Sequence, residues 1–274
     1  MIFKYLGGLA MGVLCAVAAT SATATPAKVF LEDLTAPELH DRVSSGTTTV
    51  LVPIGGTEQN GPHMVLGKHN ARAKFLATRI AERLGNAVVA PVIAYVPEGS
   101  ITPPAAHMRF TGTISISETA FESILESTAK SFRQHGFHDI VFLGDHGGYQ
   151  KSMLRAADKI NKAWGGDTSF RAYGLTAYYE ASEAPFNQIL RSKGFTAAEI
   201  GTHAGLSDTS LALAVDPALV HTDKLADAAK NSPANGVAGD PRKSTAEIGQ
   251  WGVDLIVDKS VQAIQHAIQQ RSSH

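Results

Sequence analysis

Two short segments of the chain carry the side chains most suited to chemistry. The first, EQNGPHMVLGKHN, begins at Glu58 and also contains His63 and His69 among turn-forming Gly and Pro residues. The second, DHGG, begins with Asp145 and His146. Carboxylates and imidazoles bind metals and transfer protons. These residue types therefore indicate a metal site or an acid–base site assembled from two loops that lie far apart in the sequence.

The elements around these segments predict how they meet. TTVLVPIGG reads as a buried strand that leads into Glu58, and DIVFLG reads as a second strand directly before Asp145. Strands that alternate with helical runs predict a mainly parallel sheet covered on both faces. Ligands of such sheets collect at the C-terminal ends of the strands. Because both polar segments follow strand ends, we expect them to lie side by side.

The pattern of apolar residues along the chain predicts four strands and five helices, which alternate until two helices follow each other at the end. The predicted strands cover residues 48–56, 86–96, 139–148 and 169–179, and the predicted helices cover 71–85, 117–134, 151–164, 207–215 and 246–269. A Gly-, Pro- and Asn-rich segment at 230–244 is typical of a loop that acts as a lid or a subunit contact.

Length and charge restrict the class of protein. The chain has 274 residues, which suits one large domain with a substantial core. It carries 24 basic and 25 acidic side chains, for a formal net charge of -1. This balance gives no electrostatic reason to expect nucleic acid or an anionic membrane as a partner. A small-molecule substrate is the partner that we expect.

The N-terminus has the pattern of a secretory signal peptide. Lys4 precedes a short apolar run and an Ala-Thr-Ala site, which predicts cleavage after Ala24 and a mature domain at 25–274. The alternative is a retained signal anchor, although the run is short for a membrane span. The single cysteine, Cys15, lies in this segment, so the mature protein has no disulfide and no thiolate nucleophile. We expect a periplasmic or secreted protein without membrane attachment after cleavage.

Five ordered segments together resemble one known family. They are VPIGGTEQNGPHMVLGKH, HMRFTGTISIS, LGDHGGYQ, THAGLSDTSLAL and GVAGDPRKST, and the resemblance runs from about residue 40 to 260, nearly the whole mature chain. They are similar to motifs of the creatininase (creatinine amidohydrolase) family. The resemblance implies a creatininase-like three-layer αβα sandwich with a mainly parallel central sheet. It also implies a divalent-metal hydrolase of amide or cyclic amide C–N bonds, and a homo-oligomer, namely a hexamer.

The resemblance also implies a ligand set, with informative departures. Glu58 and His146 match the metal-binding Glu and His of the family. His69 stands where the family has an Asp that bridges two metals, Asn60 stands where it has a ligating His, and Gly148 stands where creatininase has a ligating Glu. A neutral imidazole has one free lone pair, so His69 cannot bridge two cations.

What remains is a set for one metal. Glu58, His69 and His146 provide one carboxylate and two imidazoles, enough for a single catalytic zinc with an open position. Mn²⁺ or Fe²⁺ would accept the same set. We therefore expect one divalent cation, Zn²⁺ first, with a metal-activated water as the nucleophile. The alternative is a polar cluster that no longer binds metal.

Further roles follow from the same motifs. His203 or Asp208 is the expected general acid or base, and Asp145 is expected to orient His146. Each has a structural alternative: His203 as a buried hydrogen-bonded imidazole, Asp208 as a helix cap, and Asp145 as a turn residue. His63, next to a proline, is expected to pack beneath the site rather than to bind metal.

The expected substrate pocket is lined by Asn60, His107 and Arg109. The sequence thus predicts an exported metal-dependent hydrolase of a non-peptide or cyclic amide C–N bond. Two alternatives stay open at this stage. One is a hydrolase of a lactone or another carbonyl compound, since a single zinc site would serve both. The other is a non-catalytic metal- or small-ligand-binding protein on the same fold.

Overall fold

A computed structural model describes residues 1–2, 28–230 and 232–272. The predicted signal peptide at 1–24, including Cys15, therefore lies outside the described residues except for its first two. Within the described ranges, no helix combines the length and hydrophobicity that crossing a membrane requires.

The centre of the fold is a parallel sheet of four strands in the order β2-β1-β3-β4. The strands are β1 (Thr49–Ile54), β2 (Ala87–Val89), β3 (Asp139–Gly144) and β4 (Arg171–Gly174). The two central strands pair over their whole length, from Thr49 with Asp139 to Ile54 with Gly144, and every residue in them is buried. The predicted parallel sheet is confirmed.

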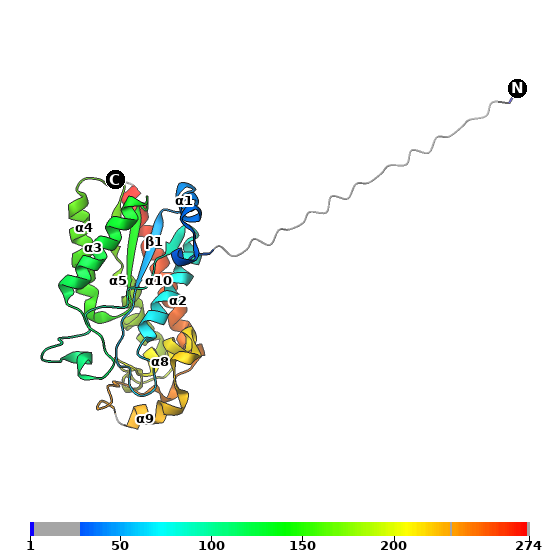
Figure 1. Cartoon of the computed structure of the whole chain (residues 1–274). Coiled ribbons are helices and arrows are strands. Elements are labelled where there is room, and N and C mark those ends of the chain that lie inside the picture. The colour runs from blue at the N-terminus through cyan, green and yellow to red at the C-terminus, as the bar shows by residue number, and fades with distance from the viewer. Residues whose placement is uncertain (3–27, 231, 273–274) are drawn as a thin grey trace.

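Helices cover both faces of this sheet (Figure 1). On one face lie α3 (Glu118–Gln134) and α4 (Gln150–Trp164), and on the other lie α2 (Lys68–Leu84), α5 (Thr176–Ser182) and α10 (Ala246–Ser272). Side chains alternate along β1 between the two cores: Val50 and Val52 pack toward α3 and α4, whereas Leu51 packs toward α2 and α10. The predicted three-layer αβα sandwich is confirmed.

Smaller elements close the C-terminal end of the sheet. Figure 1 shows α8 (Leu206–Val215) and α9 (Leu225–Lys230) beyond that end, where they share a third apolar cluster. The other helices are α1 (Ala36–Ser44), α6 (Ala184–Ser192) and α7 (Ala197–Ile200). Short 3₁₀ helices occupy Leu31–Asp33, Ala106–Arg109, Gly147–Tyr149, Pro217–Leu219, Thr222–Lys224 and Pro241–Lys243.

Two predicted strands are too long. The strand predicted at 86–96 ends at Val89, and the next residues include Pro91, which has no N–H to donate to a ladder. The strand predicted at 169–179 ends at Gly174, and its last residues form helix α5. That helix buries Tyr178, whose hydroxyl donates to Asp145, so a tertiary contact overrides the β-like pattern.

The strand order determines where loops can meet. The chain leaves β1 for β2 through α2, then returns across the other face through α3 to pair β3 with β1. The order therefore reverses between β1 and β3, and in open parallel sheets the ligand crevice lies at that reversal. Glu58 follows β1 and His146 follows β3, so both lie beside this crevice.

The close packing of α10 on α8 can be tested at Gly249. A Cβ atom there would lie 1.8 Å from the backbone carbonyl oxygen of Ser210 in α8. Helix propensity alone favours Gly249→Ala by about 1 kcal/mol. We nevertheless expect the variant to lose about 1–3 kcal/mol of unfolding free energy in urea titrations, because the helices must separate. The matched control is Gly166→Ala, where an added Cβ meets no atom within 4 Å. A Gly249→Ala protein as stable as wild type would contradict this packing.

Candidate active site

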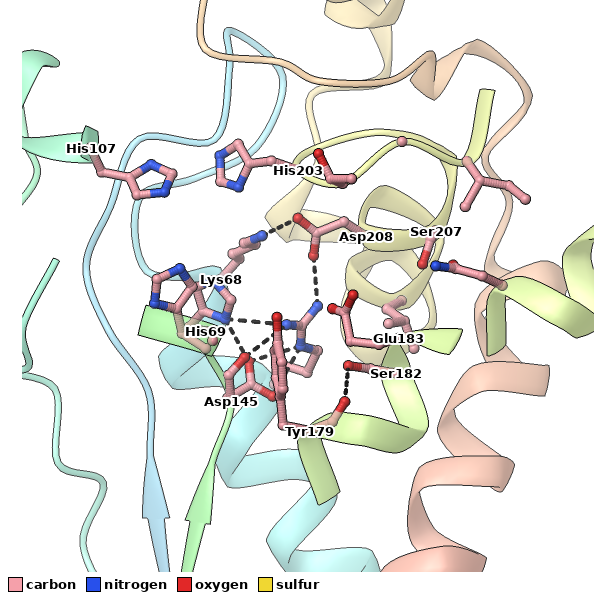
Figure 2. A pocket seen from close by; sticks show the side chains of 18 residues that line it. Lys68, His69, His107, Asp145, Tyr179, Ser182, Glu183, His203, Ser207 and Asp208 are labelled. Atoms are coloured by element: carbon pink, nitrogen blue, oxygen red, sulfur yellow. Dashed lines mark hydrogen bonds and ion pairs between the residues drawn. The ribbon is translucent and has the colours of Figure 1, made fainter. Parts of the chain in front are cut away.

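A small cavity opens at the C-terminal ends of β1 and β3. Its volume is about 160 Å³, and its walls include the predicted site residues His69, His107, Asp145, His146, His203 and Asp208. Figure 2 shows His107 and His203 facing each other, with Lys68 and His69 beneath them. The loops after β1 and β3 therefore meet as predicted.

Glu58 is the centre of this arrangement. Its side chain is fully buried, and Nε2 of His69 lies 2.8 Å from Oε1. Nε2 of His107 and Nε2 of His146 lie 3.2 and 3.6 Å from Oε2, and Nδ1 of His203 lies 3.9 Å from Oε1. Burial alone would raise the pKa of Glu58, but the neighbouring His69, His146 and Lys68 together outweigh this effect, so the pKa lies below its ordinary value. One carboxylate thus faces four imidazoles.

Two groups of donor atoms around Glu58 have the spacing of a metal site. One joins Glu58 with His69 and His146, and the other joins Glu58 with His107 and His203. Within each group the ligand atoms lie within 4.8 Å of one another. A histidine can bind metal only through a nitrogen that carries no proton, and the partner of its other nitrogen decides which one that is. The groups behind the rings therefore distinguish the two sites.

His69 has a strong acceptor behind its ring. Its Nδ1 lies 2.6 Å from Oδ2 of Asp145, which also accepts from Nε of Arg72 at 2.8 Å. Burial would raise the pKa of Asp145, but Arg72 and His69 lower it, so this carboxylate is ionised. Nη2 of Arg72 lies 3.2 Å from Nδ1 of His69, but the shorter contact to the carboxylate holds the proton on Nδ1. Nε2 is then free to bind a cation beside Glu58.

His107 has a donor behind its ring. The amide of Gln59 is fixed because its Oε1 accepts from the N–H of Gly61 at 3.0 Å and its Nε2 donates to the carbonyl of Gly236 at 3.2 Å. The same Nε2 lies 3.3 Å from Nδ1 of His107, which must therefore accept. The proton of His107 then sits on Nε2 and points toward Glu58. Because Nε2 of His107 carries a proton, it cannot bind a cation. The group of Glu58, His107 and His203 therefore lacks one of the three ligands of a metal site.

His203 is arranged as a proton acceptor. Its Nε2 lies 3.0 Å from the backbone carbonyl of Gln59 and 3.2 Å from the side-chain Nε2 of Gln59. The two amide hydrogens of Gln59 are used by Gly236 and His107, so Nε2 of His203 carries the ring proton and donates to the carbonyl. This leaves the lone pair on Nδ1, the nitrogen that faces Glu58. Burial, reinforced by the charge of Lys68, lowers the pKa of His203 to about 4, so the ring is neutral at neutral pH. This geometry agrees with the predicted acid–base role, with His203 beginning as the base.

The acid–base role predicted for Asp208 does not fit the structure. Its carboxylate contacts Nζ of Lys68, accepts from Nη1 of Arg72 at 2.7 Å and accepts from the N–H of Ala204 at 3.0 Å. Burial would raise the pKa of Asp208, but Lys68 and Arg72 hold it well below its ordinary value. A carboxylate held this firmly in the ionised form has no proton to give. The alternative of a helix cap is also wrong, because α8 begins after Gly205 without a side-chain cap.

Two residues predicted for the substrate pocket do not line this cavity. Asn60 is buried, and its Nδ2 donates to the backbone carbonyls of Glu58 and Val65 at 2.9 and 3.2 Å, so it braces the loop. Arg109 is exposed and lies on a neighbouring cavity of about 240 Å³. His63 is fully buried beneath the site with Nε2 2.9 Å from Oγ1 of Thr209, as its structural interpretation predicts.

The role predicted for Asp145 needs a correction. It was expected to orient His146, but it holds His69. The side chain beside Nδ1 of His146 is Glu98, whose Oε2 lies 3.2 Å away. Burial, reinforced by the charge of Glu58, raises the pKa of Glu98 to about 9. Glu98 was not predicted as a site residue, although it follows the predicted strand at 86–96. A location directly after a predicted strand is what identified the other polar segments.

Three other functional side chains were also missed. Lys68 and Arg72 stand one helical turn apart on α2 and point inward beside His69, a spacing that the sequence already contained. Tyr149 joins the two loops: its hydroxyl accepts from the N–H groups of Asp145 and His146 at 3.0 and 3.1 Å. Its single O–H is shared between the carbonyls of Ile54 and Gly55, at the end of β1 and just after it, which lie 2.8 and 2.7 Å away.

Comparisons with known proteins agree with this fold and site. A family model described as creatininase, creatinine amidohydrolase, matches residues 32–264. Creatinine amidohydrolase of Pseudomonas putida is 26% identical over 261 residues, covering 88% of this chain and 96% of that protein. The mycofactocin precursor peptide peptidase of Mycolicibacterium smegmatis is 30% identical over 237 residues, covering 79% and 82%.

Solved creatininase structures share the fold. A crystal structure of creatinine amidohydrolase superposes with a TM-score of 0.71 at 24% identity, covering 88% of this chain and 98% of that one. A manganese form of creatininase gives a TM-score of 0.72 at 25% identity, covering 88% and 99%. The family model spans most of the chain, and four of the five ordered motifs contribute residues to one cavity. The chain therefore belongs to the creatininase family of metal-dependent amidohydrolases.

Proposed function

We propose that the protein hydrolyses a non-peptide or cyclic amide C–N bond of a small molecule with one divalent cation, held by Glu58, His69 and His146. The observation that carries this proposal is Nε2 of His69 at 2.8 Å from Glu58, with Asp145 holding the proton on the opposite nitrogen. One carboxylate and two imidazoles suit Zn²⁺ with an open position, and also Mn²⁺ or Fe²⁺. Related creatininase structures are described as manganese and zinc–zinc forms.

The buried charges support one cation rather than two. When ionised, four carboxylates in and around the cavity face two cationic side chains: Glu58, Glu98, Asp145 and Asp208 against Lys68 and Arg72. Glu98, with its pKa raised to about 9, keeps its proton until a nearby cation favours its ionised form. The surplus of two negative charges reached at that point equals the charge of a single divalent cation. A second cation would leave an uncompensated positive charge in a buried site, which is costly. Lys68, 4.0 Å from Glu58, already supplies positive charge at this position.

The side chains divide the chemistry among them. Glu58, His69 and His146 would hold a divalent cation, which would supply activation of a water molecule and polarisation of the substrate carbonyl. His203, neutral and with Nδ1 facing Glu58, takes the proton from the attacking water and returns it to the leaving nitrogen. His107 points its Nε2 proton at Glu58 and fixes the orientation of that carboxylate. Asp145 keeps His69 in the tautomer that binds a cation.

The size of the cavity favours a small substrate. Its volume of about 160 Å³ is well below the roughly 300–1,000 Å³ of pockets for drug-sized ligands. The Pseudomonas putida relative is named for creatinine, a small cyclic amide, whereas the Mycolicibacterium smegmatis relative is named for a precursor peptide. The cavity supports the first of these substrate classes. Export to the periplasm and a hexameric assembly are further proposals, which rest on the N-terminal segment and on the family resemblance.

A substrate panel tests the activity. Purified protein loaded with Zn²⁺ or Mn²⁺ is incubated with small cyclic amides, matched lactones and short peptides, and ring opening or amine release is followed by mass spectrometry. We expect turnover of cyclic amides that chelator abolishes and added metal restores. Turnover of lactones alone would support the broader carbonyl hydrolase, and stoichiometric metal binding without any turnover would support the non-catalytic binding protein.

The ligand set predicts a selective loss of metal. We expect His146→Ala to bind zinc at least about 100-fold more weakly than wild type in calorimetric titrations, because one of three ligands is removed. Circular dichroism should stay unchanged, since His146 lies in a loop at the end of β3. The exposed His40 in α1 provides the control variant His40→Ala. Full metal content in His146→Ala would exclude this ligand set.

The positive charge of Lys68 beside Glu58 leads to a separate prediction. Lys68→Met removes a cation 4.0 Å from Glu58 and leaves Asp208 short of a partner. We expect the chelator-treated variant to lose about 3–5 kcal/mol of unfolding free energy, because a buried ion pair is broken. Zinc should bind this variant more tightly than wild type, since a repelling charge is gone. Weaker zinc binding would show that Lys68 does not take the place of a cation, and the exposed Lys130→Met serves as control.

A further inference from the structure

Glu98 is a buried carboxylate that does not belong to the proposed ligand set. It lies in the loop between β2 and α3, and its residue is 3% exposed. Within the described part of the chain, neither of its carboxylate oxygens makes a hydrogen bond. Buried polar groups are almost always hydrogen-bonded, because an unpaired one costs free energy. An unpaired carboxylate beside an active-site histidine therefore points to a hydrogen-bond donor that it gains in the functional state of the site.

The surrounding loops are shaped to hold this carboxylate in place. The backbone N–H of Glu98 donates to Oγ of Ser115 at 3.0 Å, and that hydroxyl donates to the carbonyl of Gly99 at 2.7 Å. Gly56 leaves the room that the side chain needs, since a Cβ there would lie 2.5 Å from Oε1 of Glu98. The position of Glu98 is thus fixed by contacts from two other segments.

His146 is the group that Glu98 faces. Nδ1 of His146 lies 3.2 Å from Oε2 of Glu98, without the alignment of a hydrogen bond, and 3.3 Å from the N–H of Gly148. If Nδ1 accepts from Gly148, the proton sits on Nε2 and points at Glu58, where it excludes a cation. If a small turn of the ring lets Nδ1 donate to Glu98, the lone pair on Nε2 is free.

We propose that Glu98 is a positioning residue that accepts the Nδ1 proton of His146 and thereby presents Nε2 to the cation. This inference rests on the proposed metal site. Each histidine of that site would then have a carboxylate behind its ring, as His69 already has in Asp145, whose Oδ2 lies 2.6 Å from Nδ1. Carboxylates behind ligating histidines orient the ring and strengthen the metal bond, and their loss lowers metal affinity by about 10- to 100-fold.

The test compares Glu98→Leu, which has no acceptor, with Glu98→Gln, which keeps an oxygen of the same reach. Zinc dissociation constants are measured by chelator competition on the full chain. We expect Glu98→Leu to bind about 100-fold more weakly and Glu98→Gln to remain within about tenfold of wild type. Glu118→Gln is the matched control, because Glu118 and Glu98 line one cavity beside the site but the side chain of Glu118 is exposed.

A spectroscopic measurement keeps the test decisive if the leucine variant folds poorly. In cobalt-loaded protein, ring N–H protons of ligating histidines give shifted proton resonances that persist only when hydrogen-bonded. We expect two such signals in wild type and in Glu98→Gln, and loss of one in Glu98→Leu.

Equal zinc affinity in Glu98→Leu and wild type would overturn this inference while leaving the metal site intact. Equal weakening in the leucine and glutamine variants would also overturn it, because the acceptor oxygen would then be irrelevant. A wild-type protein that binds no zinc would instead overturn the proposed function.

Discussion

The buried carboxylate of Glu58 is the constraint on which the rest of the site depends. An ionised group without water is stable only when charges and donors replace its hydration. Here His69 lies 2.8 Å away and Lys68 lies 4.0 Å away, and three further imidazoles face the same two oxygens. The first turn of α2, the loop after β3 and the loop before α8 all serve to bring these groups to one carboxylate. The proposed divalent cation would complete the same compensation.

The fold transmits this constraint outward through a few contacts. Tyr149 ties the ends of β1 and β3 together through four backbone groups, so the loops that carry Glu58 and His146 cannot separate. The ion pairs of Asp208 with Lys68 and Arg72 join α8 to α2. The rigidity of the site therefore derives from the sheet and from the helix packing rather than from the loops themselves.

Much of this arrangement could be predicted from the sequence, but the partners of individual side chains could not. Period and composition fix which segments are buried, and the strand-end rule fixes where loops meet, so the parallel sheet and the meeting of Glu58, His69 and His146 were predicted. Which nitrogen faces which carboxylate depends on angles between loops, and no periodic signal records these. For this reason Asp145 was paired with the wrong histidine, and Glu98 was not predicted. Asp208 was predicted as an acid or base, although Lys68 and Arg72 keep its carboxylate ionised.

The four imidazoles show why residue type alone does not assign a role. His69 and His107 both point Nε2 at Glu58, at 2.8 and 3.2 Å, yet one stands before an ionised carboxylate and the other before an amide N–H. The group behind each ring determines where its single proton resides, and so whether the ring offers a lone pair or a donor. Gln59 makes this choice for His107 and His203 through opposite ends of the same residue, its amide nitrogen and its backbone carbonyl. The proposed metal site therefore depends on the groups behind the rings, Asp145 and Gln59, as much as on the histidines themselves.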